Sequence, residues 1–147
     1  MADHSIVGFR VSSDKADFDL ERVHYWLSED AYWSKGIAIG TVERAFANSL
    51  AFHLLNERDE QVGVARMVTD RATFAYLADV YIEAKHRGRG LGIFLMDHIT
   101  SHPDLQGLRR QILATSDMHG LYEKYGFTIL KQPEILMEKL SATAKCC

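Results

Sequence analysis

The chain has 147 residues, of which 47% are hydrophobic and 25% charged, and its formal net charge is -3. This size and balance suit one soluble globular domain, which we place at residues 1–141. The acidic balance argues against nucleic-acid binding, which demands a basic surface. No apolar run approaches the roughly 18 residues that a membrane helix needs.

The two ends of the chain add little to this. The first residues, M-A-D-H-S, include an acid and lack an apolar core, so they do not resemble a secretory signal or a transit peptide. We therefore expect a cytoplasmic protein. The two cysteines, Cys146 and Cys147, are adjacent and cannot link distant parts of the fold. We interpret residues 142–147 as a disordered tail.

Hydrophobic periodicity predicts the elements of the first half of the chain. Residues 6–11 have the pattern of a strand, 17–27 that of an acid-started amphipathic helix, and a second helix follows Thr41. Strand formers occupy residues 49–55 and 61–68, and the polar N-E-R-D-E between them is typical of a hairpin turn.

In the second half, the apolar residues 74–82 predict a strand that leads into a glycine-rich turn and a helix from about Gly90. A strand over 109–115, a short helix over 118–125 and a closing hairpin of 126–130 with 135–140 follow. The expected order is β, α, α, β, β, β, α, β, α, β, β. No repeat or linker divides it.

The most informative segment is I-E-A-K-H-R-G-R-G-L-G, residues 82–92. Gly88, Gly90 and Gly92 let successive backbone N–H groups converge on one anion, and the helix that follows directs its positive end to the same place. The dinucleotide fingerprint would need glycine at Ile93, and a P-loop would need a G-K-[ST] ending, so neither fits. The pattern therefore predicts a phosphate-binding loop of another kind.

The loop matches R-x-x-G-x-G from Arg87 to Gly92, and a second motif, L-Y-E-K-Y-G-F, follows at residues 121–127. With both motifs in this order, the sequence resembles the GNAT superfamily of acyl-CoA-dependent N-acetyltransferases. The resemblance implies an α/β protein of GNAT-type fold, with a central mixed, mostly antiparallel sheet flanked by helices. It also implies acetyl-CoA as cofactor and CoA as product.

The resemblance further implies that the pantetheine arm runs along the strand ahead of the loop and that the loop amides hold the pyrophosphate. The cofactor-binding residues expected on this basis are Val80, Tyr81, Ile82, Arg87, Gly88, Arg89, Gly90, Leu91, Gly92 and Ile93. Tyr122 matches the tyrosine that many members place beside the CoA sulfur. A phenol of pKa about 10 can donate a proton to a thiolate. The alternative is a tyrosine that packs the core.

The general base is not evident, because the positions where family members carry a carboxylate hold Arg110 and Tyr76. Asp79, Asp117 and His119 are the remaining candidates for the base or for contacts to the acceptor. Asp79 is the only charge within 74–82, so it is either functional or lies at a β-bulge with its carboxylate reaching solvent. Asp117 could instead cap the next helix, and His119 could be a surface residue.

Tyr32 and Trp33 lie in the region that usually walls the acceptor site in the family. Their polar surroundings fit a loop better than the core, so they are candidates for substrate binding, with a loop that has no such role as the alternative. The histidine spacing predicts no metal site. We expect direct attack of an amine on the thioester, with a small amine or amino-acid derivative as acceptor, or else a protein lysine or N-terminus. The rival interpretations are a non-catalytic acyl-CoA sensor and a nucleotide-binding protein. The resemblance leaves a homodimer open.

Overall fold

The computed structural model describes residues 6–144. Its centre is a five-stranded sheet in the order β1-β2-β3-β4-β5. The strands are β1 (Arg10–Ser12), β2 (Leu50–Leu55), β3 (Gln61–Thr69), β4 (Phe74–Ile82) and β5 (Arg110–Leu113). The first four pair antiparallel, and β5 pairs parallel to β4. This is the mixed, mostly antiparallel sheet that the family resemblance implies.

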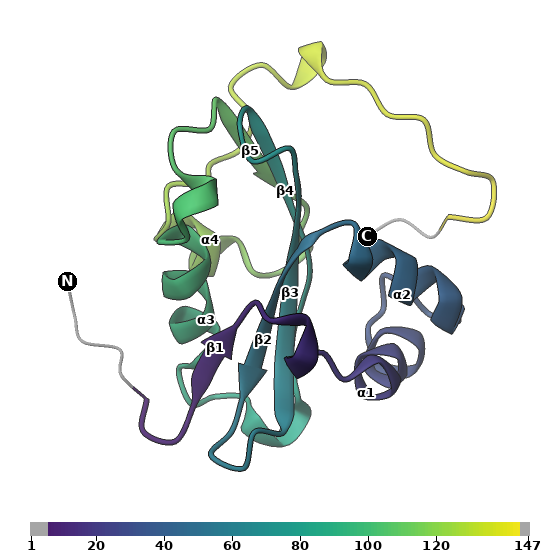
Figure 1. The fold of residues 1–147 in the computed structure, drawn as a ribbon. Coiled ribbons are helices and arrows are strands. Elements are labelled where there is room, and N and C mark those ends of the chain that lie inside the picture. The colour runs from purple at the N-terminus through teal and green to yellow at the C-terminus, as the bar shows by residue number, and fades with distance from the viewer. Residues whose placement is uncertain (1–5, 145–147) are drawn as a thin grey trace.

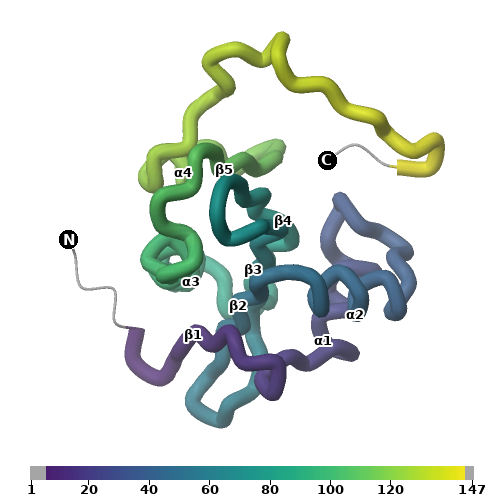
Figure 2. Tube along the Cα trace, turned by 45° about the horizontal axis from the view of Figure 1, so that its top comes forward, coloured from purple at the N-terminus to yellow at the C-terminus, as the bar shows by residue number. Residues whose placement is uncertain are grey.

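Helices cover both faces of the sheet (Figures 1 and 2). On one face lie α1 (Leu20–Tyr25) and α2 (Ile39–Ala47), and on the other α3 (Leu91–Thr100) and α4 (His119–Glu123). Short 3-10 turns occur at Lys15–Asp17, Ala84–His86, Pro103–Leu105 and Pro133–Ile135. Among residues 6–144, none of the helices is both long and apolar enough to cross a bilayer.

Each face has its own hydrophobic core. Buried side chains of α1 and α2, such as Val23 and Phe46, pack with Val64 and Tyr81 of the sheet. On the opposite face, buried side chains of α3, with Tyr122 of α4, pack on β2, β3 and β4. The predicted apolar periodicity of these helices is therefore explained by burial against the two faces.

The first helix begins later and ends later than its pattern predicts. Asp19 caps α1 by accepting the Arg22 N–H at 3.1 Å, while Asp17 belongs to the preceding 3-10 turn. After Tyr25 the helix continues as a π turn, Trp26–Asp30, in which the N–H of Ala31 donates to the Trp26 carbonyl at 2.9 Å. This turn holds one residue more than an α-helical turn.

A β-bulge interrupts β4 opposite Ala65. The pair Val64 and Tyr81 is followed by Arg66 and Ala78, so two residues of β4 face one residue of β3. The pairing of β4 with β5 runs only from Phe74–Arg110 to Leu77–Leu113. Within the described chain, the rest of β4 has no partner strand on the β5 side.

Three of the predicted strands differ in the structure. The first begins only at Arg10, because Gly8, with φ 89°, lies in a turn closed by the N–H of Phe9 and the carbonyl of Ile6. The closing hairpin of 126–130 with 135–140 was wrong: these residues form no strand. A strand needs a neighbouring ladder, and the chain leaves the sheet after this point (Figure 1).

The predicted tail lies partly outside the described residues. Residues 142–144 are exposed and end in a turn, in which the N–H of Ala144 donates to the Ser141 carbonyl at 3.1 Å. Residues 145–147, which include both cysteines, are not described.

Candidate active site

The glycine loop joins β4 to α3 as the sequence predicts. Gly88 and Gly90 have φ of 76° and 80°, a region that residues with a Cβ rarely adopt. Gly90 precedes α3 and gives it no side-chain cap. The first helical hydrogen bond runs from the N–H of Phe94 to the carbonyl of Gly90 at 3.0 Å. The amides of residues 91–93 therefore lie at the positive end of the helix without helical acceptors, an arrangement that suits an anion.

The two arginines of the loop contact the protein itself. Arg87 donates from Nε to the Ile82 carbonyl at 2.8 Å and from Nη2 to Asp30 at 3.2 Å. The Arg89 guanidinium lies 5.6 Å from the centre of the Phe9 ring. These contacts hold both side chains near the loop, and their predicted role at the pyrophosphate stays a prediction.

Tyr81 links β4 to the π turn. Its hydroxyl donates to the Asp30 carboxylate, and the Arg87 guanidinium lies 5.0 Å from the centre of its ring. The hydrogen bond from Tyr81, aided by Arg87, lowers the pKa of Asp30. Burial, followed by the bond to Asp30, raises the pKa of Tyr81 to about 12. Asp30 therefore stays ionised and Tyr81 protonated at neutral pH.

The predicted pantetheine strand offers a main-chain edge without a partner strand in the described chain, although its Ile82 carbonyl already accepts from Arg87 Nε. Val80, Tyr81 and Ile82 lie beyond the bulge, where β4 still pairs with β3. On the other side, the pairing with β5 ends at Leu77. This edge leads directly into the glycine loop, so an extended amide-containing ligand could add to β4 as a further strand would.

Tyr122 lies on α4, only 8% exposed, and packs against the core of the sheet. Burial raises the pKa of its hydroxyl, with smaller contributions from Asp117 and Tyr32. Among residues 6–144, none forms a hydrogen bond with this hydroxyl. The side chain thus packs the core, as one interpretation expected, and also keeps a protonated donor group.

Tyr32 reaches the chain between β5 and α4. Its hydroxyl lies 2.7 Å from the Ser116 hydroxyl, and its ring meets Trp33 edge to face at 5.1 Å. The Ser116 hydroxyl also lies 3.5 Å from Asp117 Oδ1, and these two residues lead into α4, which carries Tyr122. Three of the predicted site residues, Tyr32, Asp117 and Tyr122, therefore gather at one end of the sheet.

Asp117 does not cap α4, which was the alternative to a role in the site. The Thr115 hydroxyl accepts the N–H of Met118 at 3.0 Å, and the side chain of Asp117 makes no such bond. His119 is the first residue of α4 and is exposed. It lines a cavity beside β5 together with Tyr122.

Asp79 lies at the predicted bulge, with φ 54°. Its side chain is only 12% exposed, and its carboxylate is bonded within the protein. Oδ1 accepts from Trp33 Nε1 at 2.9 Å and Oδ2 from Arg66 Nε at 2.6 Å. Because both oxygens are engaged, Asp79 is poorly placed to act as a base. It holds Trp33 against the sheet.

The partners of these residues were not predicted from the sequence. Arg66 is the only charge within 61–69, as Asp79 is within 74–82, so two lone opposite charges on neighbouring strands could have signalled the pair. No comparable signal identifies Asp30 or Ser116.

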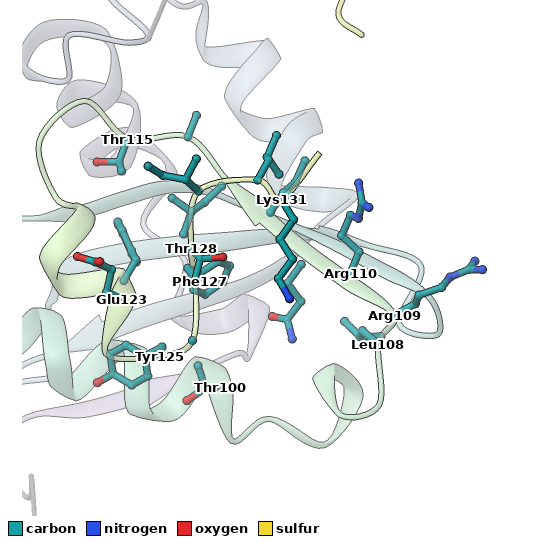
Figure 3. A pocket seen from close by; sticks show the side chains of 18 of the residues that line it. Thr100, Leu108, Arg109, Arg110, Thr115, Glu123, Tyr125, Phe127, Thr128 and Lys131 are labelled. Atoms are coloured by element: carbon teal, nitrogen blue, oxygen red, sulfur yellow. The ribbon is translucent and has the colours of Figure 1, made fainter. Parts of the chain in front are cut away.

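Figure 3 shows the cavity beside β5, which has a volume of about 1450 Å³. Residues 109–115 form one wall and residues 126–132 much of the other. Within the described ranges, no group of three His, Cys, Asp or Glu side chains could hold a metal ion.

Residues 48–129 match the family model described as the acetyltransferase (GNAT) domain. A protein of Gibberella zeae to which acetyltransferase activity is attributed is 33% identical over 137 residues, covering 79% of this chain and 76% of that protein. A GNAT-family crystal structure from Xanthomonas campestris is 48% identical, with a TM-score of 0.88, and covers 90% of this chain and 93% of that one.

A GNAT-family acetyltransferase from Elizabethkingia anophelis, crystallised with acetyl-CoA bound, shares the fold. It is 12% identical with a TM-score of 0.63, and the match covers 85% of this chain and 79% of that one. The chain belongs to the GNAT family of acetyltransferases.

Proposed function

We propose that this protein transfers an acetyl group from acetyl-CoA to a small amine or amino-acid derivative. The observation that carries the proposal is that β5, and with it the pairing to β4, ends after four residues at Leu113, while β4 continues to Ile82. The glycine loop follows β4 and Tyr122 follows β5, so both lie beyond the carboxyl ends of these parallel strands. Ligands of open α/β sheets bind at such places.

The chain offers a fitting site for CoA. The main chain of Val80, Tyr81 and Ile82 would hold the pantetheine arm, and the amides of residues 88–93 would hold the pyrophosphate. Gly88 and Gly90 have no Cβ, so they can adopt a positive φ and leave these amides unobstructed. When bound, acetyl-CoA supplies the activated acyl group as a thioester.

Tyr122 is the proposed proton donor. Its raised pKa keeps the proton on Oη at neutral pH, where it is ready for transfer to the sulfur that leaves as the amine attacks the acyl carbon. The proton that the amine loses passes to water or to one of the two other candidate bases, Asp117 and His119, because both oxygens of Asp79 already accept hydrogen bonds. No covalent enzyme intermediate is required.

Tyr32, Trp33, Asp117 and His119 are the proposed acceptor contacts. The aromatic pair Tyr32–Trp33 is anchored at both ends, to Ser116 and to Asp79, so it forms a fixed wall. The Asp117 carboxylate beside it would attract a cationic amine. This combination favours a small amine over a protein lysine or N-terminus, which needs a broad docking surface.

The test is release of free CoA thiol from acetyl-CoA in the presence of a panel of amines. Tyr122→Phe should lower kcat by about 10²-fold or more while calorimetry shows unchanged CoA affinity. Tyr25→Phe is the matched control, because this tyrosine is 63% exposed and outside the site. An unchanged kcat would remove Tyr122 from the mechanism. CoA binding without thiol release across the panel would favour the sensor.

A further inference from the structure

Tyr125 lies two residues beyond the end of α4, and its side chain connects that helix to α3. The Tyr125 hydroxyl donates to the Asp97 carboxylate at 2.7 Å and also lies 3.1 Å from the carbonyl oxygen of Ile93. Its ring packs against the core that α3 and Tyr122 share. Burial, followed by the bond to Asp97, raises the pKa of the Tyr125 phenol, so the hydroxyl remains a hydrogen-bond donor at neutral pH.

The two ends of this connection belong to the two halves of the candidate active site. Ile93 lies in the first turn of α3, and its amide is the last of those proposed to hold the pyrophosphate. At the other end, the N–H groups of Tyr125 and Phe127 both donate to the Tyr122 carbonyl, at 2.9 and 3.3 Å. One hydroxyl therefore connects the turn that follows Tyr122 to the turn that would hold the phosphates.

An apolar contact joins the same two helices but defines their relative position less well. A Cβ added at Gly92 would lie 3.8 Å from Leu121 Cδ2, so α4 packs over the glycine turn at an ordinary distance. Apolar contacts have no preferred direction, whereas hydrogen bonds weaken steeply when the donor is turned away from the acceptor. The hydroxyl of Tyr125 thus gives this contact a direction.

We propose that Tyr125 is a positioning residue, which sets where the Tyr122 hydroxyl lies relative to the amides of the glycine loop. The inference rests on the proposed function, in which those amides hold the pyrophosphate and Tyr122 donates a proton to the departing sulfur. The pyrophosphate and the sulfur are parts of one bound molecule, so a donor held relative to the first is also held relative to the second. A misplacement of about 1 Å can lower a rate about 10²-fold.

Tyr125→Phe tests the role of the hydroxyl, because it keeps the ring and removes both contacts to α3. We expect kcat for release of CoA thiol to fall about tenfold, while CoA affinity in calorimetry stays within about twofold of the wild type. Tyr25→Phe serves as the control for loss of a phenol hydroxyl. This tyrosine is 63% exposed on α1, on the other face of the sheet, so its kcat should not change.

A double-mutant cycle with Tyr122→Phe separates positioning from a general loss of structure. If Tyr125 acts through Tyr122, Tyr125→Phe should change kcat by less than about twofold once the Tyr122 hydroxyl is absent. An equal loss in both backgrounds, or no loss in the single variant, would overturn the inference and leave Tyr122 as the donor. An unchanged kcat in Tyr122→Phe alone would remove the donor, and the inference with it.

Hydrogen exchange gives a readout that does not require acetyl transfer. Binding of CoA to the wild type should slow amide exchange at residues 91–95 and also at 122–127, because the two turns are connected. In Tyr125→Phe the slowing at 91–95 should persist, and the slowing at 122–127 should be at least about threefold smaller. Equal slowing at 122–127 in both proteins would contradict the inference, even in a protein that releases no thiol. Absence of CoA binding would remove both the proposed function and the inference.

Discussion

Asp79→Asn isolates the ion pair that anchors the proposed acceptor wall. Asparagine tolerates the left-handed backbone at this position, where φ is 54°. Its side-chain oxygen can still accept the hydrogen bond from Trp33 Nε1. The change therefore removes mainly the 2.6 Å contact between Asp79 and Arg66 and leaves the guanidinium without its counter-charge.

The expected loss follows from the burial of the two side chains, which are 19% and 12% exposed for Arg66 and Asp79. Breaking a fully buried pair costs about 3–5 kcal/mol and an exposed pair about 0–1 kcal/mol. We expect a fall of about 2–3 kcal/mol in the free energy of unfolding, equivalent to about 5–10 °C in Tm for a domain of this size.

The control is Asp104→Asn, because Asp104 pairs with Arg71 at the surface, where both side chains are more than 40% exposed. Its loss should not exceed about 1 kcal/mol. Urea unfolding followed by tryptophan fluorescence, at one protein concentration throughout, measures both. If Asp79→Asn lowers the free energy of unfolding no more than Asp104→Asn does, the Asp79–Arg66 pair does not anchor the Tyr32–Trp33 wall.

Two further predictions concern pH and the glycine loop. Burial lowers the pKa of His53 to about 4 from 6.5, so the folded protein resists a proton that the unfolded chain accepts. That contribution is complete above pH 6.5 and should fall by about 3 kcal/mol as the pH drops towards 4. Urea unfolding against pH should show a shallower slope in His53→Gln, and an identical slope would contradict this. Gly90→Ala should lower stability by about 1 kcal/mol and weaken CoA binding in calorimetry, because φ is 80°. Gly92→Ala should change stability and CoA binding less, because an added Cβ there comes no closer than 3.8 Å to Leu121, an ordinary contact. If the two alanine variants lost the same stability and CoA affinity, the left-handed backbone at Gly90 would not explain the effect.

The strand β4 and the start of α3 could be predicted from the sequence to within one residue. The apolar run 74–82 has the length of a buried strand, and Gly90 ends the loop where a left-handed residue precedes the helix. Both signals are local. The closing hairpin was predicted wrongly, because residues 126–140 contain strand formers but, in the described chain, lie beside no strand with which they pair.

The candidate site shows the same division. Tyr122 and the glycine loop are carried by short motifs, so their places follow from the sequence. The contact between Tyr81 and Asp30 joins residues 51 positions apart and depends on how the π turn presents Asp30. No periodicity or motif encodes that orientation, which only the packed structure shows.

The π turn also sets how tolerant α1 is of changes in length. Deleting one residue within Trp26–Asp30 would restore regular α-helical bonding and relieve an uncommon backbone form. The same deletion would rotate the following residues by about 100° around the helix axis. Asp30 would swing away from Tyr81 and Arg87. A shorter, more regular helix would thus lose the hydrogen bonds that connect the glycine loop to the helices on the α1 face of the sheet.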